Sequence, residues 1–263
     1  MMVKRTLVPS ALAVLLAGAV GCGGSAPVAR ESAPVAATPA ALPIASAEPS
    51  TSPVAALVPS EPPVAEAPPP PPLPEGTMIL HVGDSFVHSG LTQALKPKFK
   101  ALGAKYEVRA EHSTNSMDWA KRVPGLVAAI RPDLVIVTLG GNEIGSKWLD
   151  VEANAVGRIV AAIGDRPCIW TTPPLWREEE GVFDTIAKSL GHCRFFETDV
   201  QVGTFIPRRD DKIHPTAEGG AMWAEALYGY LVRERAGAPL PWSLKDGPPD
   251  EKATKGKRNA LPH

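Results

Sequence analysis

The sequence has no marked excess of charge of either sign, since its formal net charge at pH 7 is −1 over 263 residues. It also lacks a cluster of basic residues interleaved with aromatic ones, the usual surface of a protein that binds nucleic acid. These two absences exclude nucleic acid as an expected partner. They also give no reason to expect adhesion to a membrane surface through charge alone.

The apolar run near the N-terminus is too short to cross a bilayer. Residues 7–20 are mostly apolar and follow Lys4 and Arg5, but the run is rich in Ala and Gly. A helix that spans a membrane needs about 20 predominantly apolar residues. A short basic segment followed by a short apolar run is typical of a cleaved signal peptide. We therefore expect residues 1–22 to be a signal peptide and the protein to be exported.

Cysteine is scarce, with three residues in the chain, and the first of them ends the predicted signal peptide. The segment from Ala19 to Cys22 resembles a bacterial lipobox, with Ala19 where Leu is most usual. In such signals the Cys is lipidated and becomes the first residue after cleavage. The alternative is ordinary signal peptidase cleavage near the same small residues. We predict that Cys22 carries a lipid anchor, which attaches the protein to the bacterial cell envelope.

Two segments lack the apolar periodicity of a folded domain. Residues 23–76 are dominated by Ala, Pro, Ser, Val and Glu, and residues 237–263 are polar. Such segments bury too little surface to offset the entropy of ordering them. We predict a disordered linker and a disordered tail around one domain over residues 77–236, which at roughly 160 residues is long enough for a sizeable core.

Short apolar runs alternate with helical patterns along this domain. The five runs that favour strands are residues 77–82, 106–110, 133–139, 167–171 and 193–197. The helical patterns occupy residues 91–102, 119–130, 151–163, 182–190 and 215–233. Pro97 is expected to bend or interrupt its helix, and Pro124 to break its helix or to mark its start. The alternation predicts a parallel sheet of five strands with helices on both faces.

Ligands of such sheets bind at the carboxyl ends of the strands, where three polar motifs fall. Gly83-Asp84-Ser85 follows the first strand, so the Ser85 hydroxyl is expected to be exposed near unpaired backbone N–H groups. Helix capping by Asp84 or Ser85 is the alternative. Asp211 precedes His214 by three residues on a predicted turn, a spacing that lets the carboxylate orient the imidazole as a base.

The alternative for Asp211 and His214 is a solvated surface loop, and the neighbouring Asp210 competes for the same role. The third motif, Gly140-Gly141-Asn142-Glu143, follows the third strand. Its glycines let the backbone approach a ligand, and the Asn142 amide is suited to donate to an oxyanion. A glycine-rich strand exit is the alternative. No single alternative accounts for all three motifs at the ends of their strands.

Together the three motifs resemble those of the SGNH (GDSL-like) hydrolase superfamily, over about residues 77–231. The resemblance implies a flavodoxin-like three-layer α/β/α fold and cleavage or transfer of acyl esters without a metal or other cofactor. It makes Ser85 the nucleophile, His214 the general base and Asp211 the residue that orients it. Asn142 and the Ser85 backbone N–H become oxyanion donors. Glu143 stands where the family has Asp.

The family's second oxyanion motif contains a glycine, and residues 112–116 contain none. Asn115 is the candidate donor through its backbone N–H, with Ser116 as the neighbouring alternative. His88, one turn after Ser85, is a weaker candidate for lining the pocket. Three tryptophans that follow these loops are candidates for a sugar-stacking rim or for core packing: Trp119, Trp148 and Trp176.

Cys168 and Cys193 open the predicted fourth and fifth strands, which would be neighbours in a parallel sheet. Export permits a disulfide between them. The function that the sequence favours is hydrolysis of an acyl ester, acetyl above all, on a small molecule or a cell-surface polysaccharide. The alternatives are an O-acyltransferase that uses the same residues and a catalytically silent, glycan-binding envelope lipoprotein.

Overall fold

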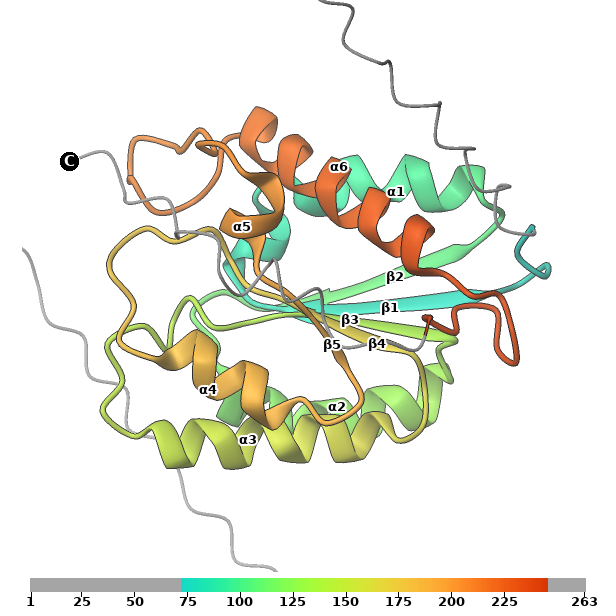
Figure 1. Ribbon diagram of the computed structural model, residues 1–263, viewed down its shortest axis with the longest axis horizontal. Coiled ribbons are helices and arrows are strands. Elements are labelled where there is room, and N and C mark those ends of the chain that lie inside the picture. The colour runs from blue at the N-terminus through green and yellow to red at the C-terminus, as the bar shows by residue number, and fades with distance from the viewer. Residues whose placement is uncertain (1–71, 246–263) are drawn as a thin grey trace, which may run out of the picture. The chain divides into compact units, whose positions relative to one another are not determined.

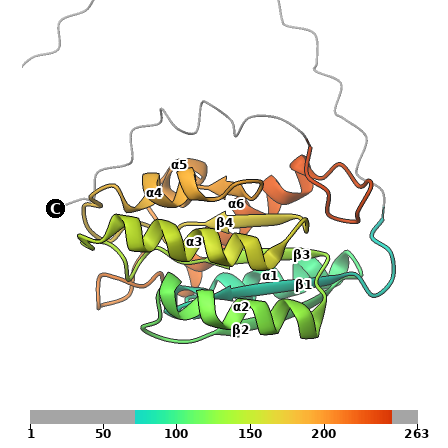
Figure 2. The same ribbon diagram turned by 90° about the horizontal axis from the view of Figure 1, so that it is seen from below.

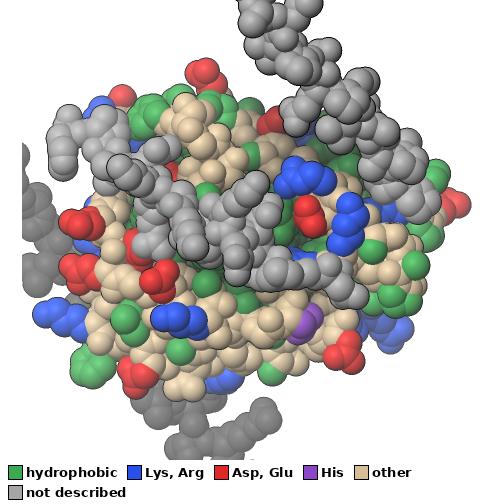
Figure 3. All heavy atoms as spheres, viewed as in Figure 1, with side chains coloured by type: hydrophobic (Ala, Val, Ile, Leu, Met, Phe, Trp, Pro, Cys, Tyr) green, Lys and Arg blue, Asp and Glu red, His purple; other side chains and the backbone are tan. Residues whose placement is uncertain are grey.

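The structure is a computed structural model that describes residues 72–245. The predicted signal peptide, Cys22, residues 23–71 of the linker and the tail from residue 246 lie outside the described residues. Among the helices of residues 72–245, none is long and apolar enough to cross a bilayer. Lys and Arg side chains lie among Asp and Glu side chains over the coloured part of the face in Figure 3, in keeping with the balanced composition.

The centre of the domain is a sheet of five parallel strands, in the order β2-β1-β3-β4-β5 (Figure 1). The strands are β1 (Met78–Gly83), β2 (Lys105–Ala110), β3 (Leu134–Thr138), β4 (Cys168–Thr171) and β5 (Arg194–Phe196). Every side chain of the central strand β3 is buried, as its continuous apolar sequence leads one to expect. The predicted sheet is therefore confirmed.

Helices cover both faces of the sheet (Figures 1 and 2). One face carries α1 (Leu91–Ala101), α5 (Thr198–Val202) and α6 (Ala217–Glu234). The other carries α2 (Ser116–Ile130), α3 (Leu149–Ile163) and α4 (Val182–Ser189). Each face has its own cluster of buried apolar side chains. The three-layer α/β/α fold is thus confirmed.

The two prolines do not interrupt their helices, contrary to expectation. α1 runs through Pro97 and α2 runs through Pro124, which is neither a break nor a start. Both prolines lie on the solvent-exposed side of their helix. Before Pro97, the carbonyl group that loses its helical N–H partner belongs to Gln93, an exposed residue, so water can replace that partner. Before Pro124 it belongs to Ala120, which is buried.

The packed structure continues past residue 236, where the sequence suggested a polar tail. The indole of Trp242 is fully buried and contacts the ring of Phe99 edge-on at a centroid distance of 6.0 Å. Backbone hydrogen bonds join Ala236 to Ser243 and Lys245 to Glu234. One large aromatic side chain therefore holds residues 237–245 against the helical layer that contains α1.

Cys168 and Cys193 form a disulfide, with their Cα atoms 4.8 Å apart. Cys168 is the first residue of β4 and Cys193 directly precedes β5, so the bond joins two neighbouring strands at their amino ends. Both side chains are buried. The disulfide lies at the edge of the sheet opposite to the carboxyl ends, where the candidate catalytic residues are located.

Replacing Cys193 with Ser should lower the free energy of unfolding by about 2–4 kcal/mol, because the cross-link restricts a loop in the unfolded chain. The sequence separation of the two cysteines is 25 residues. Urea denaturation of the variant measures the loss, and wild-type protein under reducing conditions should lose a similar amount. Two free thiols in non-reducing mass spectrometry of the exported protein would contradict the cross-link.

Candidate active site

Ser85 lies at the sharp turn between β1 and a short 3-10 helix, η1 (Ser85–His88). The Asp84 side chain caps η1 by accepting the backbone N–H of Phe86 at 2.9 Å. A Cβ atom at Gly83 would lie 2.3 Å from the carbonyl oxygen of Thr138 on β3, so only glycine fits there. Asp84 therefore provides the helix cap that was the alternative interpretation of this motif, and this leaves the Ser85 hydroxyl for other contacts.

The turn before α6 places Asp211 beside His214. Lys212 has a left-handed backbone conformation with φ 61°, which curls the chain around the Asp211 carboxylate. One oxygen of that carboxylate accepts the backbone N–H groups of Ile213 and His214 at 2.8 and 2.9 Å. The other oxygen lies 2.8 Å from Nδ1 of His214. Three contacts from a single carboxylate thus fix both the turn and the imidazole ring.

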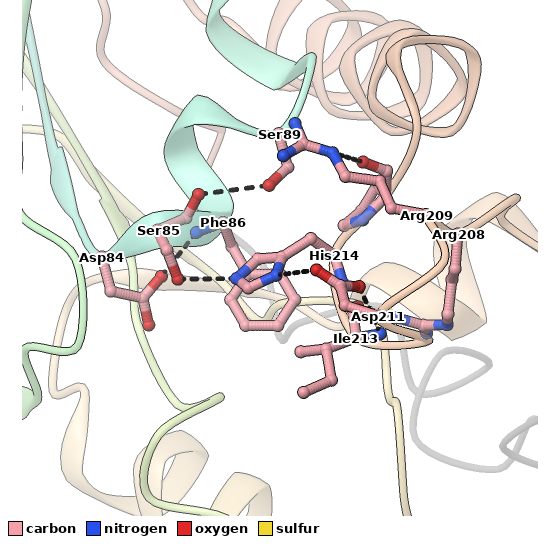
Figure 4. A network of polar contacts seen from close by, with 10 residues as sticks. Asp84, Ser85, Phe86, Ser89, Arg208, Arg209, Asp211, Ile213 and His214 are labelled. Carbon is pink, nitrogen blue, oxygen red and sulfur yellow. Dashed lines mark hydrogen bonds and ion pairs between the residues drawn. The ribbon is translucent and has the colours of Figure 1, made fainter. Parts of the chain in front are cut away.

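Arg208 supports the same turn, a role that sequence reasoning missed. Its guanidinium donates hydrogen bonds to the carbonyl oxygens of Ile213 and Leu175. Arg208 lies beside Ile213 in Figure 4. An isolated arginine in a loop gives no sequence signal for such a role, because both acceptors are backbone atoms.

The Ser85, His214 and Asp211 side chains form a continuous line of hydrogen bonds (Figure 4). Oγ of Ser85 lies 2.8 Å from Nε2 of His214, although the two residues are 129 positions apart. The Phe86 ring packs on the imidazole at a centroid distance of 4.9 Å. The structure therefore brings the three predicted residues together, and Asp211, not Asp210, is the carboxylate that contacts His214.

The electrostatics of this line favour a base at Nε2 of His214. Hydrogen bonds from the His214 ring and from the backbone N–H groups of His214 and Ile213 lower the pKa of Asp211 to about 2. The ionised Asp211 carboxylate accepts a hydrogen bond from the Nδ1–H group of His214. Nε2 of the same ring then carries no proton and can accept the one from the Ser85 hydroxyl. This arrangement is the one that a serine nucleophile requires.

Glu143 is a structural residue of the third motif. Its fully buried carboxyl accepts the backbone N–H and the hydroxyl of Ser116 at 2.8 and 2.6 Å, and the N–H of Gly140 at 3.2 Å. Burial raises the pKa of Glu143 against the effect of these donors. The side chain therefore ties the loop after β3 to the start of α2.

Asn142 lies between the nucleophile turn and the loop before α2. Its amide nitrogen donates to Oδ2 of Asp84 at 3.1 Å and to the carbonyl oxygen of Thr114 at 2.8 Å. Both amide N–H groups are therefore engaged by the protein. Burial raises the pKa of Asp84 to about 8. The hydrogen bond from the Phe86 N–H opposes this shift, and the nearby Glu143 carboxyl adds to it. Neutral Asp84 is the weaker acceptor, so its bond to Asn142 is the easier of the two to exchange for another acceptor.

The paired glycines of this loop make room for side chains of the protein and not for a ligand, contrary to expectation. A Cβ atom on Gly141 would lie 2.6 Å from the ring of Phe86. One on Gly140, whose φ is 123°, would lie 3.2 Å from the ring of Phe183. Gly141 thus admits the same Phe86 ring that packs on His214.

Asn115 is wrongly placed for a backbone oxyanion donor. It is the N-cap of α2, where its N–H donates to the Asp118 carboxylate and its side chain accepts the Asp118 N–H. The N–H of Ser116, the alternative, is held by Glu143. The N–H groups of Ser85 and Thr114 make no hydrogen bond within residues 72–245. Thr114 directly follows Ser113, whose φ is 60°. The carbonyl oxygen of Thr114 accepts a hydrogen bond from the Asn142 amide.

The remaining candidate residues, one histidine and three tryptophans, differ in how far they are exposed to solvent. His88 is exposed and stacks on the ring of His112 at a centroid distance of 5.7 Å. Trp119 is buried in the core and donates to the Thr114 hydroxyl, and Trp176 is half-buried. Trp148 is 70% exposed. Of the three tryptophans, Trp148 is therefore the one available to a ligand.

One group of potential metal ligands occurs among the described residues, and it consists of Cys168, His192 and Cys193. Its two cysteines are joined in the disulfide. The group belongs to the amino ends of β4 and β5 and not to the edge that carries Ser85.

No protein-family model and no curated protein matches the sequence. Solved structures do match. A lipase/acylhydrolase from Enterococcus faecalis has a TM-score of 0.51 and 17% identity, over 65% of this chain and 100% of that one. The two chains therefore share the three-layer fold around a parallel sheet.

Two further structures resemble this chain less closely. An acetylxylan esterase from Geobacillus stearothermophilus, determined as a catalytic mutant, has a TM-score of 0.49 and 18% identity, over 59% of this chain and 94% of that one. The psychrotrophic esterase EstA from Pseudoalteromonas sp. has a TM-score of 0.45 and 18% identity, over 58% and 95%. At these identities the similarity concerns the fold, so function has to be argued from the residues of this site.

Proposed function

We propose that the protein is a serine hydrolase that cleaves acyl esters through an acyl-enzyme. The observation that carries this proposal is the hydrogen-bonded line of Ser85, His214 and Asp211 at the carboxyl edge of the sheet. A serine hydroxyl alone is a weak nucleophile at neutral pH. A base at 2.8 Å that is itself held by a carboxylate is the arrangement that activates it.

The geometry supports a two-step reaction. Ser85 Oγ attacks the ester carbonyl carbon while Nε2 of His214 takes the hydroxyl proton, and Asp211 stabilises the resulting imidazolium. The tetrahedral intermediate collapses, and the leaving alcohol receives that proton from His214. Water then attacks the acyl-enzyme with His214 again as base, which releases the carboxylic acid and restores the Ser85 hydroxyl.

The N–H groups of Ser85 and Thr114 are the proposed donors to the negative oxygen of the intermediate. Both are without a hydrogen-bond partner within residues 72–245. The Asn142 amide is the proposed third donor, and it would exchange its bond to the largely neutral Asp84 for one to the oxyanion. The two backbone N–H groups need no such exchange, so the rearrangement is confined to the Asn142 amide.

The proposed substrate is the ester of a small acyl group, with acetyl as the first choice, on a carbohydrate or another small alcohol. Purified protein should release acetate from aryl acetates, and Ser85 should be labelled by a serine-directed organophosphonate. Acetyl transfer to an added polysaccharide in place of acetate release would make the protein an O-acyltransferase with the same residues. A protein that binds glycan but never labels at Ser85 would be the silent envelope lipoprotein instead.

We also propose that the protein is exported and held at the bacterial envelope by a lipid on Cys22. The support is the sequence of residues 1–22 alone. Stable attachment needs more than one acyl chain, which a lipidated N-terminal cysteine supplies. Cys22→Ser should therefore shift the protein from the membrane fraction to the soluble fraction and slow its processing. Wild-type protein recovered wholly in the soluble fraction would contradict the anchor.

A further inference from the structure

A pocket of about 450 Å³ opens beside Asn142. It lies between the loop after β3 and the starts of α2 and α3, and its wall includes Asn115 and Asn142. The pocket therefore adjoins Asn142, one of the three proposed oxyanion donors. The active-site line of Ser85, His214 and Asp211 does not use it.

Exposed apolar side chains gather at this pocket. Among the described residues five large hydrophobic side chains are exposed, and three of them line it: Met117 at 39%, Trp148 at 70% and Val151 at 37%. Exposed apolar surface that is concentrated next to polar groups marks a binding site more often than scattered apolar residues do. A flat indole with most of its surface in water is suited to cover the apolar face of a ring.

A buried carboxylate oxygen without a partner lies in the same wall. Glu152, in the first turn of α3, is 4% exposed and lines the pocket. Its Oε1 is 3.4 Å from the Ser146 hydroxyl, and its Oε2 has no hydrogen-bond partner among residues 72–245. Leaving such an oxygen unpaired is unfavourable, and a hydrogen-bond donor from a ligand would relieve that cost.

We propose that this pocket binds a sugar ring of an acylated carbohydrate substrate, with the Trp148 indole stacked on the ring and Glu152 paired with a ring hydroxyl. The inference rests on the proposed function, because it assigns the substrate class of the same site. An aliphatic acyl chain is the competing occupant for an apolar pocket. Such a chain offers no donor, so it would leave the buried Glu152 Oε2 without a hydrogen-bond partner.

The test compares two acetyl esters that differ in whether a sugar is present. The substrates are a partially O-acetylated β-1,4-linked oligosaccharide and 4-nitrophenyl acetate. For Trp148→Ala, kcat/KM on the oligosaccharide should fall about 10–100-fold, mainly through KM, and stay within about twofold on 4-nitrophenyl acetate. Trp148→Phe should recover most of the loss, because a phenyl ring still stacks.

Glu152→Gln should lower kcat/KM on the oligosaccharide by about 3–10-fold and leave 4-nitrophenyl acetate unchanged, since the uncharged amide makes a weaker bond to a hydroxyl. Leu240→Ala is the matched control: Leu240 is 41% exposed but lines a different pocket, one that contains the disulfide. It should leave both activities unchanged.

Equal losses on both substrates, or no loss on either, would overturn the inference while Ser85 labelling still upheld the proposed function. A Trp148→Ala variant that loses activity only on longer-chain nitrophenyl esters would overturn it in favour of an acyl-chain pocket. Calorimetry with the Ser85→Ala variant measures oligosaccharide binding without hydrolysis, so it tests the sugar pocket independently of the proposed esterase activity. Oligosaccharide binding that Trp148→Ala abolishes would support the sugar pocket even if the wild type failed to hydrolyse any ester.

Discussion

Ser85→Ala should lower turnover of 4-nitrophenyl acetate by at least about 10⁴-fold and abolish labelling by a serine-directed organophosphonate. The variant removes the Oγ atom that lies 2.8 Å from Nε2 of His214, and with it the nucleophile. His214→Ala should be nearly as damaging, because the Ser85 hydroxyl then has no base. Asp211→Asn should be less damaging, since the Asn oxygen can still accept the backbone N–H groups that shape the turn.

Two neighbouring substitutions serve as controls for this prediction. Asp210→Asn changes the adjacent carboxylate, which does not contact the imidazole, and His88→Ala changes an exposed ring that stacks on His112. Both variants should keep activity within about threefold of wild type. Wild-type turnover in Ser85→Ala would contradict the mechanism. A loss of activity in Asp210→Asn as large as that in Asp211→Asn would contradict the role of Asp211.

Both the sheet and the nucleophile turn could be predicted because their signals are local. A continuous β-branched run predicts a strand buried on both faces, and β3 is such a strand. Trp242 could not be placed in the same way, since a single aromatic residue in a polar segment gives no periodicity. Its burial depends on contacts such as that with Phe99, far away in the sequence. Pro97 was misjudged because the cost of a helical proline depends on whether the lost hydrogen bond faces water.

In the candidate site, too, local contacts could be predicted from the sequence and long-range contacts could not. Asp211 and His214 meet within one turn, so their spacing alone predicts their contact, and the left-handed Lys212 shows how the turn closes. For Asn115 the sequence holds a further local signal: Asp118 follows three residues later, and the two residues form a reciprocal helix cap that uses the Asn115 N–H. The hydrogen bond from the Ser116 N–H to Glu143 joins residues 27 positions apart, so no local sequence pattern predicts it.

Asn142→Ala should lower kcat by about 10²–10³-fold, because it removes the side chain that we propose to join the backbone N–H groups of Ser85 and Thr114 at the oxyanion. The variant should also be less stable by about 1–3 kcal/mol, since Oδ2 of Asp84 and the Thr114 carbonyl lose their donor. Both quantities are measurable on one preparation, by steady-state kinetics and by urea denaturation.

Thr114→Gly separates the backbone of this residue from its side chain. The substitution keeps the Thr114 N–H but removes the hydroxyl that donates to the Glu111 carbonyl and accepts the Trp119 indole N–H. If the oxyanion donor is the N–H, Thr114→Gly should lose stability and keep kcat within about tenfold, because glycine adopts the required backbone conformation without strain. A kcat as low as that of Asn142→Ala would assign the effect to the Thr114 hydroxyl. Full activity in Asn142→Ala would leave Asn142 as a structural link between Asp84 and Thr114, with stabilisation of the oxyanion left to the backbone alone.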